Sequence, residues 1–562
     1  MVSALEAVRQ GLRAEDLDFV WVPSTDRYLN EYVPPEESIR QWLTGFDGSM
    51  GEALVGHEGA WLVVDGRYWQ QAEAQVDPRT WTVVRTDGST MLDEATQEIL
   101  RARGPNIRVG FDPDRFTMDR LRRLRSETRC VWVPTELLGR LRPRTELGAS
   151  VCRWVAPANG NRRKAIWEHL PKDLDALVIQ PLDDIAYLSG LRAHELPHQS
   201  TFRAHCLLTR ERLLLATEAA EPVRNVEDAE WCGTQATDLA TRALALNLRR
   251  VGFDPRVTAV GWADALRQRG LDLVEIKSPI AKIKSNKNPQ ELLWMKAALR
   301  RADLVMEDVI ETACADVVAG KTVTEADVRN RVEERFRDHG ATDLSFSVIA
   351  AAGVNAAHVH YTSPSRSRSL RRGELMLIDA GAYFHEGYAT DLTRTFLVGA
   401  PEDRGRPEQI ERYTLVLRAA LAGMRARLPS TATGAQLDGV VRARMWEVGC
   451  DYAHGTGHGV GISVHEYPPR ISGLSADRLE PNQVFSVEPG LYDPAWGGIR
   501  IENLCTVKPD PRRPGWLRVV PLTYSPLDER LIDPNALDEA ERSWLAAFGE
   551  AHRLGQEISL DA

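Results

Sequence analysis

The longest regular pattern in the chain lies between residues 288 and 319, where hydrophobic residues recur every three or four positions. This spacing indicates one buried face of an α-helix. Asn288, Pro289 and Glu291 form an N-cap, a proline in the first turn and a capping-box glutamate. The pattern predicts a helix that ends before Gly320. Its core-facing residues are expected to be Leu292, Met295, Leu299, Ala302, Met306 and Val309.

Downstream of this helix, short hydrophobic stretches predict four strands, at 374–384, 389–398, 483–488 and 499–507. The first two are joined by residues 385–387, which end in glycine, so they are expected to form a hairpin. Hydrophobic and polar residues alternate at the start of the last stretch. Arg500 and Glu502 are therefore expected on one face of that strand, with isoleucines on the other.

One motif occurs twice, as Val-Gly-Phe-Asp-Pro at 109–113 and again at 251–255. Each copy follows an earlier hydrophobic segment that ends in proline, at 20–23 and at 178–181, so the two halves share one order of motifs. Each copy predicts a buried strand, followed by a helix with aspartate as N-cap and proline in its first position. The repeat indicates duplicated α/β domains. The predicted domains are 1–150, 151–280 and 281–562.

The composition narrows the class of protein. The 562 residues are too many for a single core, 43% are hydrophobic and 27% charged, and the mean hydropathy is −0.32. No hydrophobic run approaches the roughly 20 residues that span a bilayer, and the N-terminus has no secretory pattern, so no membrane association is expected. The net charge of −10, without a long basic stretch, argues against nucleic acid as a partner. Seven scattered cysteines predict free thiols and a cytoplasmic location.

Five residues of metal-ligand type stand in distinct short contexts of the C-terminal part: Asp379, Asp391, His458, Glu488 and Glu502. Four carboxylates supply more negative charge than one divalent ion requires, so the set suits two ions. Oxygen and imidazole ligands without thiolate fit manganese, cobalt or zinc. Two adjacent ions activate water at neutral pH and stabilise a tetrahedral intermediate, so the set predicts metal-assisted hydrolysis.

Each of these residues also has a purely structural interpretation. Asp379 or Asp391 alone could accept hydrogen bonds from nearby backbone N–H groups. The stretch with Arg500 and Glu502 alone is compatible with an ordinary half-exposed strand. The two aspartates on facing strands of one hairpin favour ligation, because a buried carboxylate without a cation is costly.

Histidines gather near the candidate ligands, although the chain has only 13. His454, His458 and His465 fall within twelve residues, around a loop with glycine at every second position. This spacing is not that of a dinucleotide-binding loop, and glycine allows backbone to approach a metal or substrate closely. His358 and His360 would share one face if they lay on a strand.

A second histidine pattern, His-Glu-Leu-Pro-His at 194–198, matches the zinc-peptidase signature HExxH. That chemistry needs both histidines on one face of a helix. Pro197 opposes a helix at this position, so this interpretation is rejected.

Together these motifs resemble the pita-bread metallopeptidases, the family of methionine aminopeptidase, prolidase and aminopeptidase P. The whole chain is similar to the three-domain aminopeptidase P group. Segments 45–49 and 65–69 resemble its first domain, 182–188 its second, and the tail from 521 its C-terminal extension. The resemblance implies an α/β (α+β) fold class, with two creatinase-like N-terminal domains before a pita-bread catalytic domain.

The same resemblance implies that the five candidate residues bind two divalent ions, with Mn²⁺ as the first candidate and Co²⁺ or Zn²⁺ as alternatives. Asp391 and Glu502 would contact both ions, and a hydroxide would bridge them. Glu488 would also orient or deprotonate that water. His465 would stabilise the oxyanion or hold the substrate.

Further residues receive substrate roles from the resemblance. His360 and His454 would line the substrate site and assist proton transfer. Arg500 would orient neighbouring carboxylates, and Arg67 would contact the bound peptide. Two departures from the family pattern bear on this site. The stretch between the two aspartates is one residue longer than expected, and His358 stands where the family usually has a hydrophobic residue.

The implied activity is hydrolysis of the first peptide bond of peptides with proline at position two, with release of the N-terminal residue. A homodimer that associates through the catalytic domain is expected. An Xaa-Pro dipeptidase (prolidase) shares the ligand set and remains an alternative. A non-enzymatic peptide-binding module of the same fold is the third hypothesis, although such relatives are expected to lack metal ligands.

Overall fold

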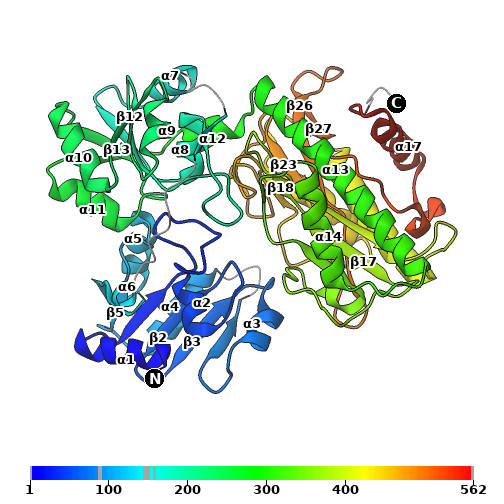
Figure 1. Ribbon diagram of the computed structural model, residues 1–562, viewed down its shortest axis with the longest axis horizontal. Coiled ribbons are helices and arrows are strands. Elements are labelled where there is room, and N and C mark those ends of the chain that lie inside the picture. The colour runs from blue at the N-terminus through cyan, green and yellow to red at the C-terminus, as the bar shows by residue number, and fades with distance from the viewer. Residues whose placement is uncertain (1–2, 87–90, 143–151, 156–159, 559–562) are drawn as a thin grey trace. The chain divides into compact units, whose positions relative to one another are not determined.

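The computed structural model describes residues 3–86, 91–142, 152–155 and 160–558 (Figure 1). It divides into two compact units. The N-terminal unit contains 1–197 and 201–280, and the C-terminal unit contains 281–562 together with the short segment 198–200.

The N-terminal unit begins with a six-stranded mixed sheet in the order β4-β3-β2-β1-β5-β6. The pairs β1–β2 and β2–β3 are antiparallel, and the other neighbours are parallel. Its strands are β1 (Phe19–Val22), β2 (Glu52–Gly56), β3 (Ala60–Val64), β4 (Thr82–Arg85), β5 (Arg108–Phe111) and β6 (Val131–Pro134). The accompanying helices are α1 (Ala4–Ala14), α2 (Ile39–Thr44), α3 (Trp69–Gln75), α4 (Leu92–Arg101), α5 (Met118–Glu127) and α6 (Leu137–Leu141).

A second six-stranded sheet in the same unit has the order β12-β11-β10-β8-β13-β14. Its strands are β8 (Ala176–Ile179), β10 (His205–Thr209), β11 (Leu213–Ala216), β12 (Ala229–Gly233), β13 (Arg250–Phe253) and β14 (Asp272–Glu275). Its helices are α7 (Gly160–Glu168), α8 (Leu182–Ser189), α9 (Ala220–Arg224), α10 (Ala236–Ala245) and α11 (Val260–Gln268). A short pair joins β7 (Arg153–Trp154) to β9 (Leu191–Arg192).

The two sheets have the same topology. Strand order and every parallel or antiparallel pairing agree, with β5 and β13 carrying the repeated motif. Equivalent positions of the two repeats also bond to each other reciprocally. Met118 N donates to Thr258 O at 3.0 Å, and Val260 N donates to Phe116 O at 2.9 Å. Such reciprocal contacts are those of a two-fold arrangement, as expected of duplicated domains.

The prediction that Asp-Pro opens a helix is wrong in both repeats. The side chain of Asp112 accepts from the backbone N–H of Asp114, and Asp254 accepts from that of Arg256, both at 3.0 Å. The aspartates therefore close local turns. Helix α5 begins only at Met118, several residues later.

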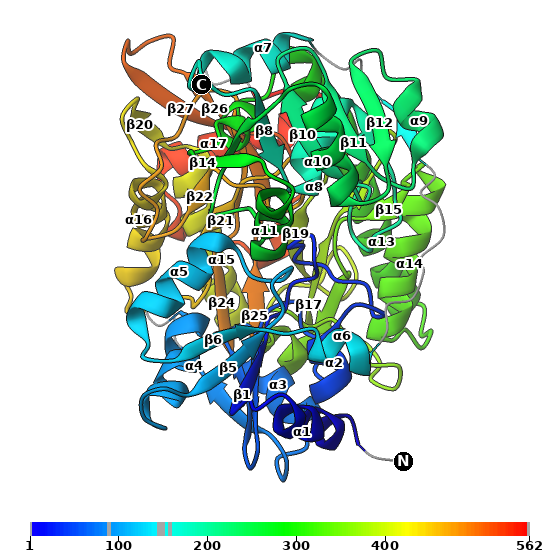
Figure 2. The same ribbon diagram turned by 90° about the vertical axis from the view of Figure 1, so that its left-hand side faces the viewer.

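The C-terminal unit contains a three-stranded sheet in the order β16-β17-β19 and a four-stranded sheet in the order β20-β27-β26-β23. The strands are β16 (Ile349–Ala352), β17 (Leu375–Ala380), β19 (Leu392–Leu397), β20 (Arg427–Pro429), β23 (Val484–Val487), β26 (Asn503–Pro509) and β27 (Trp516–Pro521). Short antiparallel pairs join β15 (Asp343–Leu344) to β18 (Ala382–Tyr383), β21 (Gly457–His458) to β22 (Arg470–Ile471), and β24 (Gly490–Asp493) to β25 (Gly497–Arg500). The predicted hairpin is confirmed, because β17 and β19 pair antiparallel (Figure 2).

Helices cover these sheets, and Figure 1 shows α13 and α14 side by side in front of β17. The α-helices are α12 (Ile280–Ser285), α13 (Pro289–Val318), α14 (Glu325–Asp338), α15 (Pro407–Met424), α16 (Gly434–Trp446) and α17 (Glu539–Leu554), and the 3-10 helices are η1 (Gly353–Ala357), η2 (Glu529–Leu531) and η3 (Pro534–Ala536). Helix α13 matches its prediction, including the capping box of Asn288 and Glu291 and its buried hydrophobic face.

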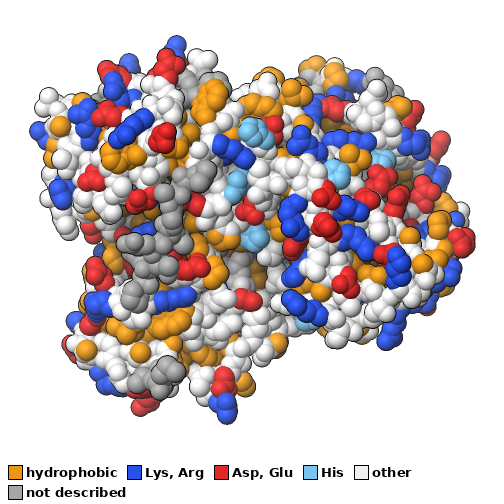
Figure 3. Space-filling model, in the orientation of Figure 1, with side chains coloured by type: hydrophobic (Ala, Val, Ile, Leu, Met, Phe, Trp, Pro, Cys, Tyr) orange, Lys and Arg blue, Asp and Glu red, His pale blue; other side chains and the backbone are white. Residues whose placement is uncertain are grey.

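In the described part of this unit, two of the hydrophobic cores join helices to sheets. One joins α13 and α14 to the three-stranded sheet, and the other joins α15, α16 and α17 to the four-stranded sheet. The predicted α/β (α+β) class is thereby confirmed. Within the described residues, no helix is long and apolar enough to cross a membrane. Positively and negatively charged side chains are interspersed on the face of the C-terminal unit that Figure 3 shows.

The hairpin of β17 and β19 depends on close approach of two backbone segments at Gly381. A Cβ atom at this position would lie 1.9 Å from the carbonyl oxygen of Thr390 and 2.3 Å from Ser345 Oγ. Only glycine fits there without displacing the strand that follows Thr390.

We expect Gly381→Ala to lower the free energy of unfolding of the C-terminal unit by about 1–3 kcal/mol, because the added methyl group overpacks the hairpin. Gly439→Ala is the matched control. Gly439 lies in α16 with nothing within 4 Å of its added Cβ, and the change should stabilise the unit by about 0.5–1 kcal/mol. Differential scanning calorimetry measures both. Equal tolerance of the two substitutions would contradict the close approach.

Candidate metal centre

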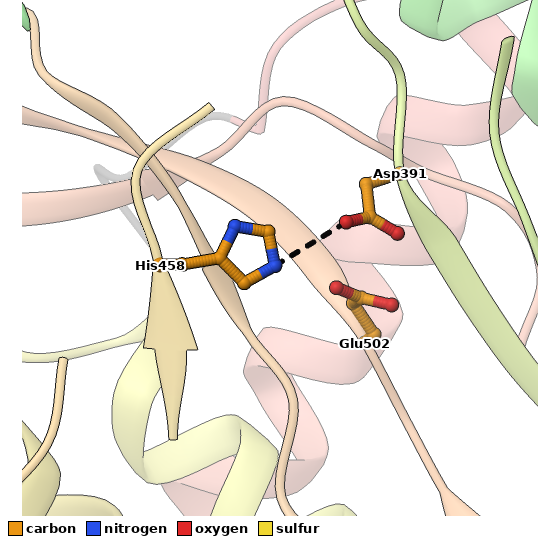
Figure 4. A group of neighbouring side chains, drawn as sticks. All are labelled: Asp391, His458 and Glu502. Atoms are coloured by element: carbon orange, nitrogen blue, oxygen red, sulfur yellow. Dashed lines mark ion pairs between the residues drawn. The ribbon is translucent and has the colours of Figure 1, made fainter. Parts of the chain in front are cut away.

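Three predicted ligands meet in the C-terminal unit. The side chains of Asp391, His458 and Glu502 point toward one another in Figure 4, and one ligand atom of each lies within 4.8 Å of the others. His458 Nε2 is 3.4 Å from Asp391 Oδ2. Asp391 directly precedes β19, His458 ends β21, and Glu502 lies between β25 and β26. All three residues are buried.

The other two predicted ligands adjoin this group. Glu488 Oε1 is 3.6 Å from His458 Nε2 and accepts a hydrogen bond from Ser486 Oγ at 3.3 Å. Asp379, near the end of β17, accepts from Arg500 Nη2 through Oδ2 at 2.6 Å. Its other oxygen, Oδ1, is buried and has no hydrogen-bond partner. The structure therefore brings all five residues to one place.

A divalent cation fits this donor set. A buried carboxylate oxygen without a partner costs free energy, and a cation beside Asp379 Oδ1 would remove that cost. Carboxylate and imidazole groups without thiolate are the ligands that manganese, cobalt and zinc accept. Among the described residues, this is the one group of three or more acidic, histidine or cysteine side chains with ligand atoms so close together.

Burial, together with neighbouring negative charges, makes the charged forms of these carboxylates costly. Burial raises the pKa of Asp379 to about 6, although the charge of Arg500 lowers it. Burial and the charges of Asp391 and Glu488 raise the pKa of Glu502 well above its usual range. Burial lowers the pKa of His458, but its hydrogen bond to Asp391 and the charge of Glu488 outweigh burial and raise it to about 9. Protons thus occupy the cluster when cations do not.

The orientation of His458 suits ligation. Its Nδ1 lies 3.1 Å from the carbonyl oxygen of Gly459, which can only accept, so Nδ1 carries the proton. The other nitrogen, Nε2, faces the carboxylates and is the atom that would bind a cation after losing its proton. In most metal-binding histidines, the ring nitrogen that does not bind the metal donates a hydrogen bond of this kind, which fixes the tautomer. His465 packs edge-on against His458, with ring centroids 4.4 Å apart.

A hydrogen-bonded chain leads from His454 to Asp379 through Tyr492, a residue that the sequence analysis missed. His454 Nδ1 is 2.8 Å from Gly455 O, and its Nε2 is 3.0 Å from Tyr492 OH. Arg500 Nη1 donates to the same hydroxyl at 2.9 Å, and burial lowers the pKa of His454 to about 4. The neutral imidazole therefore accepts the Tyr492 proton. Only the pairing of β24 with β25 reveals this tyrosine, because nothing in the local sequence marks it.

The prediction of one strand at 499–507 is wrong, because residues 501–502 separate β25 from β26. The predicted separation of the isoleucines from Arg500 and Glu502 is confirmed, but the half-exposed interpretation is wrong. Ile499 and Ile501 are fully buried in the core, and Arg500 is also buried, at 2% exposure. Thr393 joins Arg500 to the ligands, since its Oγ1 donates to Glu502 Oε2 at 2.7 Å and accepts from Arg500 Nε at 3.2 Å.

A second buried arginine, Arg394, was also missed by the sequence analysis. Its Nη1 donates to the backbone carbonyl of Glu502 at 2.7 Å, and its Nη2 donates to Ser525 O at 2.7 Å. The side chain therefore fixes the backbone that carries Glu502 rather than the ligand atoms. Asp391, three positions earlier, is the local hint, because these two partners of Arg394 lie more than 100 positions away.

His358 and His360 do not lie on a strand. The 3-10 helix η1 precedes them, and residues 358–360 form a bend and a turn. Helix η1 begins at Gly353, which has a left-handed φ of +53°. Val359 still reaches the centre, because its carbonyl oxygen lies 3.5 Å from Arg500 Nη1.

Two other predicted features lie in the N-terminal unit or at its border. Arg67 donates to both carboxylate oxygens of Asp65, at 3.0 and 2.8 Å, and its contact with a peptide remains a prediction. The HExxH segment forms no helix, as predicted. His198 has a left-handed φ of +58°, and its ring lies 3.1 Å from Ser347 Oγ. The two histidines of the segment therefore do not share a helical face, as zinc peptidases of this type require.

Comparison with known proteins identifies related families. Metallopeptidase family M24 matches residues 294–509, and the creatinase/prolidase N-terminal domain matches 5–142 and 158–291, in two family versions. A probable Xaa-Pro aminopeptidase P of Paracoccidioides brasiliensis (strain Pb03) is 31% identical over 592 residues, covering 97% of this chain and 94% of its own. An uncharacterized peptidase of Schizosaccharomyces pombe is 29% identical over 97% of this chain and 94% of its own.

Solved structures show the same fold. The X-prolyl aminopeptidase from Caenorhabditis elegans, described as a cytosolic enzyme with a di-nuclear active site, matches with a TM-score of 0.85 at 24% identity, over 95% of this chain and 91% of its own. A prolidase from Pyrococcus horikoshii matches with a TM-score of 0.53 at 26% identity, over 66% of this chain and 100% of its own. Since the 31% identity extends over nearly the full length of both sequences, the chain belongs to the Xaa-Pro aminopeptidase P group of metallopeptidase family M24, with creatinase-like N-terminal domains and a pita-bread metallopeptidase domain.

Proposed function

We propose that this protein is a metal-dependent aminopeptidase that hydrolyses the first peptide bond of Xaa-Pro peptides and releases the N-terminal residue. The observation that carries the proposal is the close group of Asp391, His458 and Glu502, with Glu488 and the unpartnered Asp379 Oδ1 beside it. The Xaa-Pro aminopeptidase P relatives, matched along nearly the full chain, supply the substrate class.

In this proposal Asp379, Asp391, His458, Glu488 and Glu502 hold two divalent ions, with Mn²⁺ the first candidate and Co²⁺ or Zn²⁺ the alternatives. Asp391 and Glu502 would contact both ions, and both residues belong to the close three-residue group. When bound, such ions polarise the substrate carbonyl and lower the pKa of water, which supplies the nucleophile at neutral pH.

The protein's own side chains do the remaining work. Glu488 lies beside His458 and accepts a proton from the attacking water. His465 is held against His458 and stabilises the negative charge that develops on the carbonyl oxygen. Water oxygen bonds to the carbonyl carbon, the carbon–nitrogen bond breaks, and the proline nitrogen takes a proton, with His360 assisting. The products are a free amino acid and a peptide with N-terminal proline.

Substrate recognition follows from the chemistry of the bond. An Xaa-Pro amide has no N–H for a site to bind, and its cis and trans forms differ by only about 0.5–1 kcal/mol. Neutral His454, held by Tyr492, lines the site without adding positive charge. Arg500 orients Asp379, and Arg67 contacts the peptide.

The same proposal covers organisation and location. We assign domains to 1–150, 151–280 and 281–562, which the three family matches and the two repeated sheets support.

We further propose a homodimer that associates through the C-terminal unit, where the exposed Trp446 and Val448 at the end of α16 offer a hydrophobic surface. A cytoplasmic location agrees with seven free cysteines and with the cytosolic Caenorhabditis elegans enzyme.

The proposal predicts that protein reloaded with manganese releases arginine from Arg-Pro-Pro, that apo protein does not, and that Gly-Pro is a poor substrate. Chromatography of the products measures each. Preference for Gly-Pro would instead assign a prolidase. Cleavage of neither peptide by protein with two bound metals would refute the substrate class.

Two variants separate the metal centre from general stability in this assay. Asp391→Asn should lower kcat/KM by about a thousandfold or more, because it disturbs both the nucleophile and charge stabilisation. Glu541→Gln makes the same change at a carboxylate with 2% exposure that pairs with Arg418 elsewhere in the unit. It should leave kcat/KM within about twofold, since it lies outside the site.

The raised pKa values predict that metal binding releases protons. At pH 7 His458, with a pKa of about 9, is mostly protonated in metal-free protein, and Glu502 also holds its proton more strongly than usual. Cations bind the deprotonated forms, so the apparent Kd for Mn²⁺ should fall about tenfold per pH unit for each proton displaced. Isothermal titration calorimetry in buffers of different ionisation enthalpy counts the protons. Affinity that does not change with pH would contradict this electrostatic account.

A further inference from the structure

A fully buried carboxylate outside the metal centre accepts several hydrogen bonds from one chain segment, and Arg368 Nη1 lies 3.8 Å from its Oε1. Glu325, the first residue of α14, has 0% exposure. Its oxygens accept hydrogen bonds from Ala352 N at 2.7 Å, Asn355 Nδ2 at 2.9 Å, Tyr361 OH at 2.9 Å and Ser365 N at 2.9 Å. All of these donors lie in residues 352–365, which we name the histidine segment because it carries His358 and His360.

The histidine segment has little other regular structure. After Ala352, which ends β16, it contains only the short 3-10 helix η1, and the residues that follow have bends, a turn or no regular structure. Its backbone N–H groups therefore lack a strand or helix to bond with over most of its length. Glu325 binds two of these N–H groups, at residues 352 and 365, so the carboxylate closes the segment into a loop.

The opposite side of the segment packs on the strand that leads to the metal centre. A Cβ atom on Gly498 would lie 1.9 Å from Ala356 O, and one on Gly497 would lie 2.2 Å from Gly353 O. Backbone therefore touches backbone along β25, which ends at Arg500. Arg500 in turn lies 3.5 Å from Val359 O and binds Asp379.

We propose that Glu325 is a positioning residue that holds the histidine segment, and through it His360, at the metal centre. The inference rests on the proposed function, since His360 assists catalysis only if the centre hydrolyses peptides. A carboxylate is required because every partner donates a hydrogen, and a charged acceptor forms stronger hydrogen bonds than a neutral one.

The direct test is Glu325→Gln. The amide has nearly the same shape, but it places an NH₂ group against donors. We expect kcat for an Xaa-Pro peptide to fall about tenfold with little change in KM, a loss typical of residues that orient a metal site from outside it. Metal content should remain at the wild-type level.

Asp327→Asn is the matched control on the same helical turn. Asp327 caps α14 through the backbone N–H of Thr324 at 2.9 Å and does not bond to the histidine segment in the described contacts. Its substitution should weaken the helix start and leave kcat within about twofold. If Glu325→Gln fails to fold, Tyr361→Phe removes one of the four donors and should lower kcat about threefold.

Two measurements distinguish positioning from general stability. In a His360→Ala background, Glu325→Gln should change kcat less than about twofold, because the imidazole that Glu325 positions is already absent. A full loss in both backgrounds would overturn the inference. In hydrogen exchange, residues 352–365 should lose protection in Glu325→Gln while residues 375–397 keep theirs, and unchanged exchange in 352–365 would also overturn it. Wild-type protein that cleaves no Xaa-Pro peptide would refute the proposed function, whereas the exchange result would still decide the role of Glu325.

Discussion

Repulsion between buried carboxylates is the constraint on which the rest of this site depends. Asp379, Asp391, Glu488 and Glu502 converge around one imidazole, and burial together with their mutual charge raises the pKa of Asp379 and Glu502. Arg500 balances part of this charge by binding Asp379. The orphaned Asp379 Oδ1 indicates that a further positive group belongs there. Two divalent cations would supply it, and the same cations would provide the chemistry.

The fold tolerates this cost because rigid elements hold the carboxylates in place. The β17–β19 hairpin supports two of them and needs Gly381 for its close approach. Thr393 and Arg394, on β19, fix the side chain and the backbone of Glu502. Such hydrogen-bonded supports outside the ligand set orient metal ligands and matter nearly as much as the ligands themselves. The proposed role of Glu325 extends this principle to the segment that carries His360.

The sequence predicted what is encoded locally. Helix α13 followed from its capping box and apolar face, and the burial of Ile499 and Ile501 followed from alternation. The repeated motif indicated two related domains, and the two sheets share one topology. Predictions from local pattern were wrong where a side chain forms other hydrogen bonds than those that its residue type usually forms. Asp112 and Asp254 close turns instead of capping helices, and the histidine segment, which donates two backbone N–H groups to Glu325, does not continue as a strand.

Tyr492, Arg394 and Glu325 were missed because their partners are distant in sequence and meet only in the folded chain. By contrast, the candidate ligands were found because each stands in a short distinctive context. The central claim is that the repulsion among them is relieved by two cations, and crystals of manganese-loaded protein test it most directly. Anomalous scattering at the manganese edge should show two peaks among Asp379, Asp391, His458, Glu488 and Glu502. One peak, or none, in fully loaded protein would contradict the account.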